Sequence, residues 1–317
     1  MGRLLIVAIA ALAAGGTAHA QRPYDVDILA ETFGFDEDTR KSVPLDKLMQ
    51  GCPARDCIPS IDDPKYVAAN NADHVADDDL VITLAYKGAH FAFPTSILDH
   101  HEIVNGAFAG DPLAITWCPL CGSAVGVKRA VGNTVTTFGV SGVLYNSDLV
   151  LYDRETETLW DQIEAKGIVG PMTDEELALI PVSMARWSRW LAKHPDTLVL
   201  STDTGFEIDY SGDRFAEYRE STRLFMPVSA TDERLHAKTV VYGFDLDVTD
   251  TALSIAFTES LLAKEGSYSR SIAGKESVIS LQEDGSVILE RDEEVFYPIR
   301  LFWFAWYTFH PETDVAQ

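Results

Sequence analysis

Two cysteines separated by two residues are the part of this sequence best suited to chemistry. Cys118 and Cys121 stand in the segment 117-WCPLCGSAV-125, where one tight turn can bring the two sulfur atoms together. Such a pair can form half of a metal site, a redox-active dithiol or a structural disulfide. A redox cysteine is commonly activated at the start of a helix, but here Gly122 and β-type residues follow. The pattern therefore favours a metal-binding turn, with thiol–disulfide exchange and a structural disulfide as the alternatives.

A turn of this kind supplies only two of the four ligands that a tetrahedral metal site needs. The nearest source of more is 99-DHHEIVNG-106, at the end of a helix expected over residues 95–104. Adjacent helical side chains point about 100° apart, so only one of the two histidines can face the ion, and we choose His101. A histidine interacting with the helix dipole is the alternative. Thiolates with imidazole are typical of zinc or copper, so the predicted metal ligands are Cys118, Cys121 and His101, with Glu102 nearby.

A second polar group stands in 145-YNSD-148, just before an apolar strand. Its side chains offer hydrogen-bond donors and one carboxylate. We expect Tyr145, Asn146 and Asp148 to line a pocket or to support the metal ligands from outside. Capping of a turn is the structural alternative.

The other two cysteines, Cys52 and Cys57, lie in the Pro-rich stretch 51-GCPARDCIPSIDDP-64. An even number of cysteines in an exported chain favours disulfides, so we expect Cys52 and Cys57 to pair with each other. The alternative is a single metal site made from all four thiolates.

The net charge of the chain limits the classes of partner that it can bind, and its first residues indicate its cellular compartment. The chain carries 25 basic and 49 acidic side chains, a net charge of −24, which repels nucleic acid and anionic lipid. The apolar run over residues 4–14, followed by Ala18-His19-Ala20, predicts a signal peptide cleaved near Ala20. This run is too short to span a bilayer. We therefore expect a periplasmic or secreted protein that does not span the membrane and whose partner is a metal ion or a periplasmic protein.

A degenerate repeat organises the rest of the chain. The segments 187-WSRWLAKHPDTLV-199 and 303-WFAWYTFHPETDV-315 share the pattern W-x-x-W-x-x-x-H-P-[DE]-T-x-V, which we read as architectural, including His194 and His310. We expect helices over 182–193 and 299–309, and a hairpin joining 123–129 to 134–140. Many short strands and few helices, without regular βαβ alternation, predict an α+β fold with mostly antiparallel strands.

The predicted organisation follows from this repeat. After the signal peptide at 1–20, a loop-rich arm at 21–79 precedes the first repeat at 80–201, which carries the Cys-x-x-Cys pair. An irregular connection at 202–237 leads to a second repeat at 238–317, which has no cysteine.

The chain resembles a bacterial family catalogued as a domain of unknown function, number 3179 in that series. The resemblance rests on 101-HEIVN-105, 117-WCPLCGSAV-125, 138-FGVSGVLYNSDLVLYDRETETLWDQ-162, 194-HPDTLVLS-201 and 303-WFAWYTFHP-311. It implies an exported protein and carries no catalytic residue over. It also implies that the Cys118/Cys121 segment and 145-YNSD-148 belong to the family pattern, whereas many relatives have Gly in place of Cys52 and Cys57. That difference favours a local disulfide there over a four-thiolate site.

Overall fold

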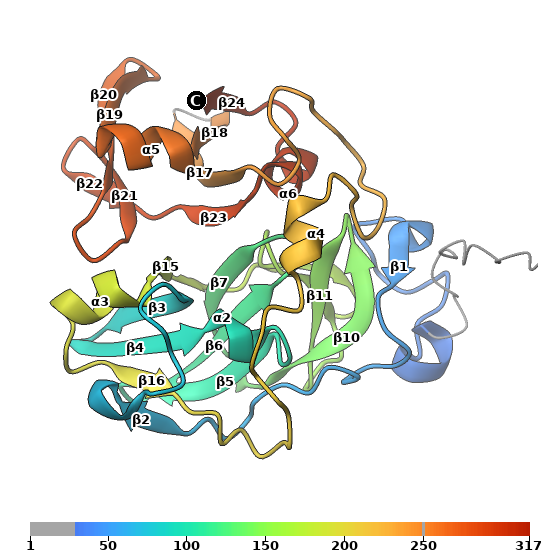
Figure 1. The fold of residues 1–317 in the computed structure, drawn as a ribbon. Coiled ribbons are helices and arrows are strands. Elements are labelled where there is room, and N and C mark those ends of the chain that lie inside the picture. Colours follow the sequence, from blue (N-terminus) through green and yellow to red (C-terminus); the bar gives the residue numbers. More distant parts are fainter. Residues whose placement is uncertain (1–28, 249–250) are drawn as a thin grey trace, which may run out of the picture.

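The computed structural model describes residues 29–248 and 251–317, so the predicted signal peptide lies outside the described residues. The protein is mostly β, with 41% of its residues in strands and 14% in helices. Five small sheets are arranged as the blades of a five-bladed β-propeller. The ribbon is drawn in Figure 1. The predicted α+β class is therefore wrong, although most strand pairs are antiparallel as expected.

Three of the sheets belong to the first two thirds of the chain. Sheet A has the order β1 (Leu48–Gln50), β10 (Phe138–Tyr145), β11 (Asp148–Asp153), β12 (Leu159–Asp161), β13 (Lys166–Val169). Sheet B has the order β14 (Leu179–Ile180), β7 (Ser123–Lys128), β6 (Asp111–Cys118), β5 (Ile103–Phe108). Sheet C has the order β15 (Ser183–Arg186), β3 (Leu80–Tyr86), β4 (Ala89–Pro94), β16 (Leu198–Leu200), β2 (Tyr66–Ala68).

Two further sheets come from the C-terminal part, drawn in orange and red in Figure 1. Sheet E has the order β23 (Ile299–Phe302), β17 (Val240–Val248), β18 (Thr251–Thr258), β24 (Asp314–Ala316). Sheet F has the order β19 (Ser267–Ile272), β20 (Lys275–Leu281), β21 (Val287–Arg291), β22 (Glu294–Phe296). A small hairpin, sheet D, consists of β8 (Ala130–Val131) and β9 (Thr134–Val135).

The described helices are all short. They are the α-helices α2 (Thr95–Leu98), α3 (Trp187–Lys193), α4 (Ala216–Glu220), α5 (Glu259–Glu265) and α6 (Trp303–Phe309), the π-helix η1 (Leu29–Phe33), and the 3-10 turns η2 (Leu45–Lys47) and η3 (Ala69–Asn71).

The fold class was mispredicted because a short apolar run fits a strand and a helix equally well. The helix expected over 182–193 is divided between β15 and α3, because Ser183–Arg186 pairs with β3. In the same way the run 299–309 is divided between β23, which pairs with β17, and α6. The helix expected over 95–104 stops at Leu98, since Ile103 already begins β5.

One mispredicted hairpin affects which residues reach the cysteine pair. The predicted pairing of 123–129 with 134–140 does not form, because β7 pairs with β6 whereas β10 pairs with β11 in another sheet. Only the tip of the expected hairpin exists, as sheet D. The turn after β10, which contains 145-YNSD-148, therefore reaches the cysteine pair from sheet A, whereas the pair itself belongs to sheet B.

The two Trp–His segments have matching local geometry. In each segment, the first Trp belongs to a helix that follows an edge strand. The indole of the second Trp donates to a Thr hydroxyl, over 2.9 Å from Trp190 to Thr197 and over 2.8 Å from Trp306 to Thr313. The next strand, β16 or β24, joins its sheet in parallel. Sheets C and E also share the strand order around these segments. These similarities are what a duplication would produce, and the duplication itself stays a prediction.

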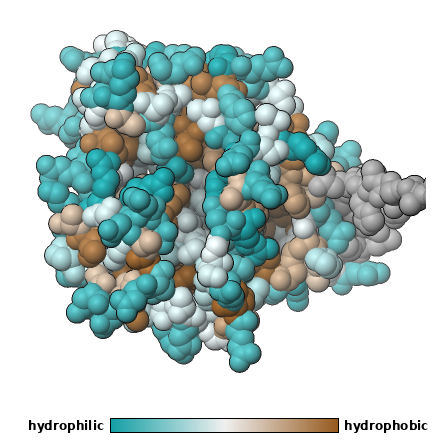
Figure 2. Space-filling view, in the orientation of Figure 1, coloured by the Kyte–Doolittle hydropathy of each residue, from teal (hydrophilic) through white to brown (hydrophobic). Residues whose placement is uncertain are grey.

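The surface agrees with the acidic composition. In Figure 2, hydrophilic side chains cover much of the visible face, and apolar side chains form scattered patches between them. Among the residues that the structure describes, no helix is long and apolar enough to cross a membrane.

Candidate metal centre

The Cys-x-x-Cys segment forms a tight turn between two neighbouring strands. Cys118 is the last residue of β6, Ser123 is the first residue of β7, and the amide of Gly122 donates to the carbonyl of Cys118 over 2.8 Å. Gly122 has a φ of +64°, and a Cβ atom there would lie 3.0 Å from the Phe302 ring. The amide of Phe302 in turn donates to the carbonyl of Cys121 over 2.8 Å. Sheet E thus holds the turn in place from outside, and a side chain at position 122 would be strained by the backbone conformation and crowded by the Phe302 ring.

A carboxylate from a different sheet meets the two sulfur atoms. The central residues of the turn between β10 and β11, Asn146 and Ser147, have φ values of 52° and 67°, as a type I′ turn requires. This turn places Asp148 at the start of β11, beside the cysteines. Ligand atoms of Cys118, Cys121 and Asp148 all lie within 4.8 Å of one another, and within the described residues this is the one such group of His, Cys, Asp or Glu. Their exposed fractions are 1%, 0% and 0%.

Two of the three candidate ligands, Asp148 and Cys121, have raised pKa values because they are buried. Asp148 Oδ2 accepts from the amide of Ile163 over 3.1 Å, whereas Oδ1 is buried and has no partner among the described atoms. Burial, and then the charge of Cys118, raises the pKa of Asp148 well above its usual range. Burial and the neighbouring Cys118 likewise raise the pKa of the Cys121 thiol, which lies 3.4 Å from the carbonyl oxygen of Ser147. Both groups are therefore held neutral unless a cation joins them.

The structure does not bring His101 into this group. Its Nδ1 lies 2.7 Å from the carbonyl of Pro59 and its Nε2 lies 2.6 Å from the hydroxyl of Tyr210, so both ring nitrogens already have partners. Glu102 is buried nearby, and burial followed by the charge of Asp148 raises its pKa to about 8. His101 therefore links the N-terminal arm to the 203–236 region, and the third candidate ligand is Asp148, which we had expected only to support the site.

Of the other predicted pocket residues, Asn146 holds a segment that covers the site, and Tyr145 contacts α6. Asn146 Oδ1 accepts from both the amide and the hydroxyl of Ser229, and Tyr145 packs edge-on against Phe309. We call residues 215–229 the covering segment. Within it, the amide of Met226 donates to the Ser147 hydroxyl over 2.9 Å, and the Tyr218 hydroxyl donates to the carbonyl of Leu120, inside the cysteine turn, over 3.1 Å.

Two further residues that sequence analysis missed fix the site in place. The Lys238 ammonium donates to the carbonyls of Ser221 and Arg223 and lies 3.7 Å from the centre of the Tyr218 ring, so it closes the covering segment. Gln162 of sheet A bonds to Thr116 and Ser123 of sheet B. These contacts hold together the two sheets that supply the candidate ligands. No local motif marks these residues, because their partners are far away in the sequence.

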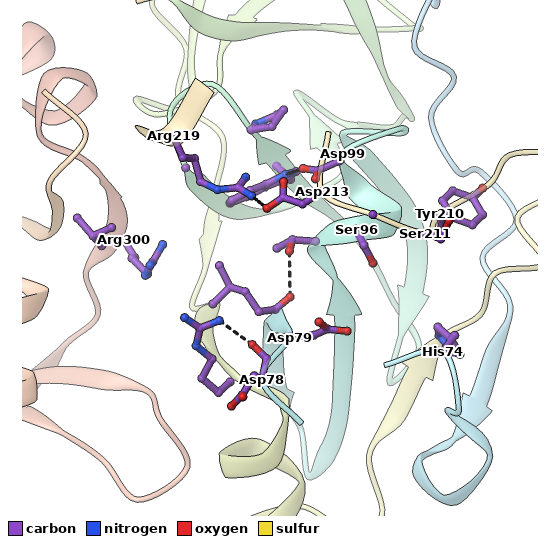
Figure 3. A pocket seen from close by; sticks show the side chains of 18 of the residues that line it. His74, Asp78, Asp79, Ser96, Asp99, Tyr210, Ser211, Asp213, Arg219 and Arg300 are labelled. Carbon is purple, nitrogen blue, oxygen red and sulfur yellow. Dashed lines mark hydrogen bonds and ion pairs between the residues drawn. The ribbon is translucent and has the colours of Figure 1, made fainter. Parts of the chain in front are cut away.

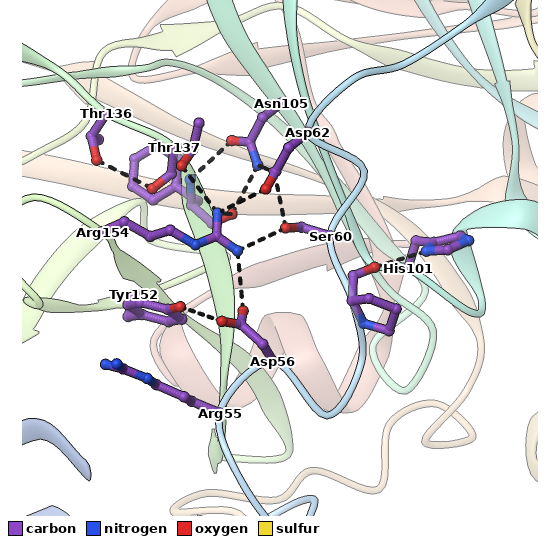
Figure 4. Close-up of polar contacts among 12 residues, drawn as sticks. Arg55, Asp56, Ser60, Asp62, His101, Asn105, Thr136, Thr137, Tyr152 and Arg154 are labelled. Atoms are coloured by element: carbon purple, nitrogen blue, oxygen red, sulfur yellow. Dashed lines mark hydrogen bonds and ion pairs between the residues drawn. The ribbon is translucent and has the colours of Figure 1, made fainter. Parts of the chain in front are cut away.

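The predicted disulfide between Cys52 and Cys57 is present, and Cys118 and Cys121 are unbonded. The disulfide loop lies over β10, where the amides of Gly51 and Cys52 donate to the carbonyl of Gly142. Arg154 then anchors the arm through Asp56, Ser60 and Asp62 (Figure 4). Because both arm cysteines are used in this disulfide, a site made from four thiolates does not form.

Fold and site together define a mostly β, propeller-like protein with a buried Cys-x-x-Cys turn facing an aspartate. Comparison with known protein families matches residues 55–297 to the family described as "Protein of unknown function (DUF3179)". The match covers well over half of the chain, and the chain belongs to this family, as the sequence motifs indicated. Searches of the curated proteins and of the solved structures give no match.

Proposed function

We propose that this chain is an exported metal-binding protein whose ion is held by Cys118, Cys121 and Asp148. The observation that carries the proposal is the convergence of three ligand atoms within 4.8 Å in a fully buried place. The buried, unpartnered Oδ1 of Asp148 adds to it, because a buried polar atom without a hydrogen bond is costly. A bound cation would supply the missing partner.

Zinc fits this ligand set better than copper. Both metals accept thiolates, but zinc also commonly takes an Asp carboxylate, whereas Cu(I) prefers soft sulfur ligands. Two thiolates and one carboxylate carry three negative charges, which a divalent ion offsets more fully than a monovalent one. The three residues leave one position of a tetrahedron for a water molecule or another ligand.

Thiol–disulfide exchange is the second candidate, and one observation favours it. Asp148, which holds its proton in the metal-free protein, lies beside both sulfur atoms and could give that proton to the thiolate that leaves when a disulfide is attacked. Against this candidate, Cys118 and Cys121 are 1% and 0% exposed, so a partner disulfide cannot reach them without movement of the covering segment. A structural disulfide between Cys118 and Cys121 is the third candidate, and it would need no metal.

The proposed location is the periplasm or the exterior of the cell. The disulfide between Cys52 and Cys57 supports it, because such bonds persist in oxidising compartments. In that environment two adjacent unbonded thiols tend to oxidise, and a bound metal ion would protect Cys118 and Cys121 from this.

The test is the metal content of the protein purified from its own compartment without chelators. We expect close to one zinc per chain by mass spectrometry, and two free thiols after denaturation. Cys118→Ser and Asp148→Asn should each lower zinc affinity by about tenfold or more. His101→Ala is the matched control, because its ring nitrogens bond elsewhere, and it should keep the metal. Absence of metal with no free thiol would reject the proposal in favour of the disulfide alternatives.

A further inference from the structure

A cavity of about 640 Å³ lies on the outer side of the cysteine turn. Its floor includes Trp117, Pro119 and Gly122 of the turn region and Phe302 of sheet E. Its walls come from sheet C, sheet E and the 203–236 region (Figure 3). A cavity of this size fits a small organic molecule. The sulfur atoms are buried behind the turn, so this space is separate from the proposed metal centre.

Three arginines line this cavity. Arg186 donates to the carbonyl of Asp78, and the other two come from distant parts of the chain. Arg219 comes from α4 and Arg300 from β23, and both are labelled in Figure 3. Arg219 pairs with Asp213 through Nη2, and Arg300 bonds to Glu259 through Nε and Nη2, over 3.1 and 3.0 Å. A guanidinium has five N–H donors, so each arginine keeps donors for a ligand.

The two positive charges act on each other. Burial lowers the pKa of Arg219, the charge of Asp99 raises it, and the charge of Arg300 lowers it. Like charges that face one cavity are destabilising, and a bound anion relieves the repulsion. The lining also holds four aspartates, so an anion would be bound here by direct contacts with the arginines and not by a positive field.

The carboxylates around the cavity offset part of the positive charge of Arg219 and Arg300, and each of them has a hydrogen-bond or ion-pair partner of its own or is exposed. Asp213 is already paired with Arg219, and Asp99 accepts from the Trp117 indole over 2.8 Å. Asp79 Oδ2 accepts from the amide of Ala76, and Asp78 is exposed. These groups lie beside the arginines as acceptors, so a ligand that also carries hydroxyl or amino groups finds partners here.

We propose that this cavity binds a small organic anion, with its carboxylate or phosphate group between Arg219 and Arg300 and its apolar body over Trp117, Pro119 and Phe302. Arginine forms charge-assisted hydrogen bonds to both kinds of oxyanion. The apolar floor favours a ligand with a flat or aromatic body over a bare inorganic ion. The proposal goes beyond metal binding and does not depend on it.

Titration calorimetry of the full mature chain with benzoate, phenyl phosphate and neutral benzamide tests this site. We expect at least one of the two anions to bind, and benzamide to bind about tenfold more weakly or not at all. Tighter binding of benzoate identifies a carboxylate ligand, and tighter binding of phenyl phosphate identifies a phosphate ester. If neither anion binds, or if benzamide binds equally well, the proposal is wrong.

Variants then locate the binding. Arg219→Gln and Arg300→Gln should each weaken anion binding by about tenfold. Arg270→Gln is the matched control, because Arg270 forms a similar ion pair with Asp314 but does not line the cavity. Val240→Trp, which places bulk in the cavity without changing charge, covers the case in which an arginine variant does not fold. Equal affinity in all of these variants would overturn the assignment.

Two observations separate this proposal from the metal proposal. The arginine variants should keep their metal, because neither arginine belongs to the ligand group. Cys118→Ser should keep its anion binding, because Cys118 lies behind the turn and does not line the cavity. Absence of metal from the wild-type protein would therefore reject only the metal proposal, and absence of anion binding by the wild-type protein would reject only the anion proposal.

Discussion

The hydroxyl of Tyr218 donates a 3.1 Å hydrogen bond to the carbonyl of Leu120, which lies between the two cysteines in the turn. This bond joins α4 directly to the backbone that positions both sulfur atoms. The next residue, Arg219, lines the cavity on the outer side of the same turn. One short helix therefore contacts the cysteine turn with one residue and the cavity with the next.

Loss of the Tyr218 hydroxyl should loosen the covering segment. We expect Tyr218→Phe to raise the rate at which a thiol reagent modifies Cys118 and Cys121 in metal-free protein by about three- to tenfold, because the Leu120 carbonyl loses its partner. Tyr297→Phe is the control, since Tyr297 is 50% exposed. Equal rates for wild type and Tyr218→Phe would mean that access to the thiols does not depend on this bond.

Metal binding should release protons near neutral pH. The pKa values of Asp148 and Cys121 are both raised, so both groups hold their protons in the metal-free protein. A cation must displace these protons, so apparent affinity rises with pH and falls as the pH is lowered. We expect about two or more protons per zinc at pH 7, measured by calorimetry in buffers of different ionisation enthalpy. Asp148→Asn should release about one fewer, and release of less than one proton by the wild type would contradict the assigned ligands.

A side chain at position 122 should destabilise the turn. Gly122→Ala combines an unfavourable φ of +64° with a Cβ 3.0 Å from the Phe302 ring, so we expect a loss of about 2–4 kcal/mol in the free energy of unfolding. Gly34→Ala has a similar φ of +69° but open space around the new Cβ, and it should cost only about 1 kcal/mol. Denaturant unfolding of both variants separates the contact with Phe302 from backbone strain. Equal losses would show that this contact contributes nothing.

Local features of the site could be predicted from the sequence. Gly122 and the β-type residues after Cys121 indicated a turn that leads into a strand, and β7 begins at Ser123. Two cysteines five residues apart in a Pro-rich loop indicated a local disulfide, which is present. In each case the residues that determine the structure are neighbours in the sequence.

The global features depend on partners that are distant in sequence. Asp148 joins the cysteines only because β10 pairs with β11 in sheet A instead of with β7 in sheet B. Nothing near residues 123–140 distinguishes these pairings, since both put apolar residues into strands. His101 was chosen as a ligand because it is close to Cys118 in sequence, yet its ring bonds to Pro59 and Tyr210. Strand pairing also overrode the helical sequence pattern at 183–186 and 299–302. The fold class predicted from that pattern was therefore wrong.

The repeated Trp–His segments allow a last prediction, on stability. The Trp190 indole donates to Thr197 and the Trp306 indole donates to Thr313, and both hydroxyls are buried. The His194 ring lies against the Trp190 indole, with ring centres 3.9 Å apart, and the His310 ring lies against the Trp306 indole, with ring centres 3.8 Å apart. Thr→Val keeps the shape of the side chain but leaves a buried indole N–H without a partner, which costs about 1–3 kcal/mol.

Thr197→Val and Thr313→Val should therefore destabilise the protein by nearly equal amounts, measured as the free energy of unfolding in denaturant. Because the two sites are in different sheets and share no partner, the double variant should show the sum of the two losses. Thr134→Val, at an exposed position in the strand β9 and outside both segments, is the comparison for an ordinary Thr→Val exchange. If one segment proved several times more sensitive than the other, their shared pattern would not reflect a shared architectural role. Equal and additive losses would support the duplication that the sequence predicts, because the same hydrogen bond would then stabilise sheet C and sheet E independently.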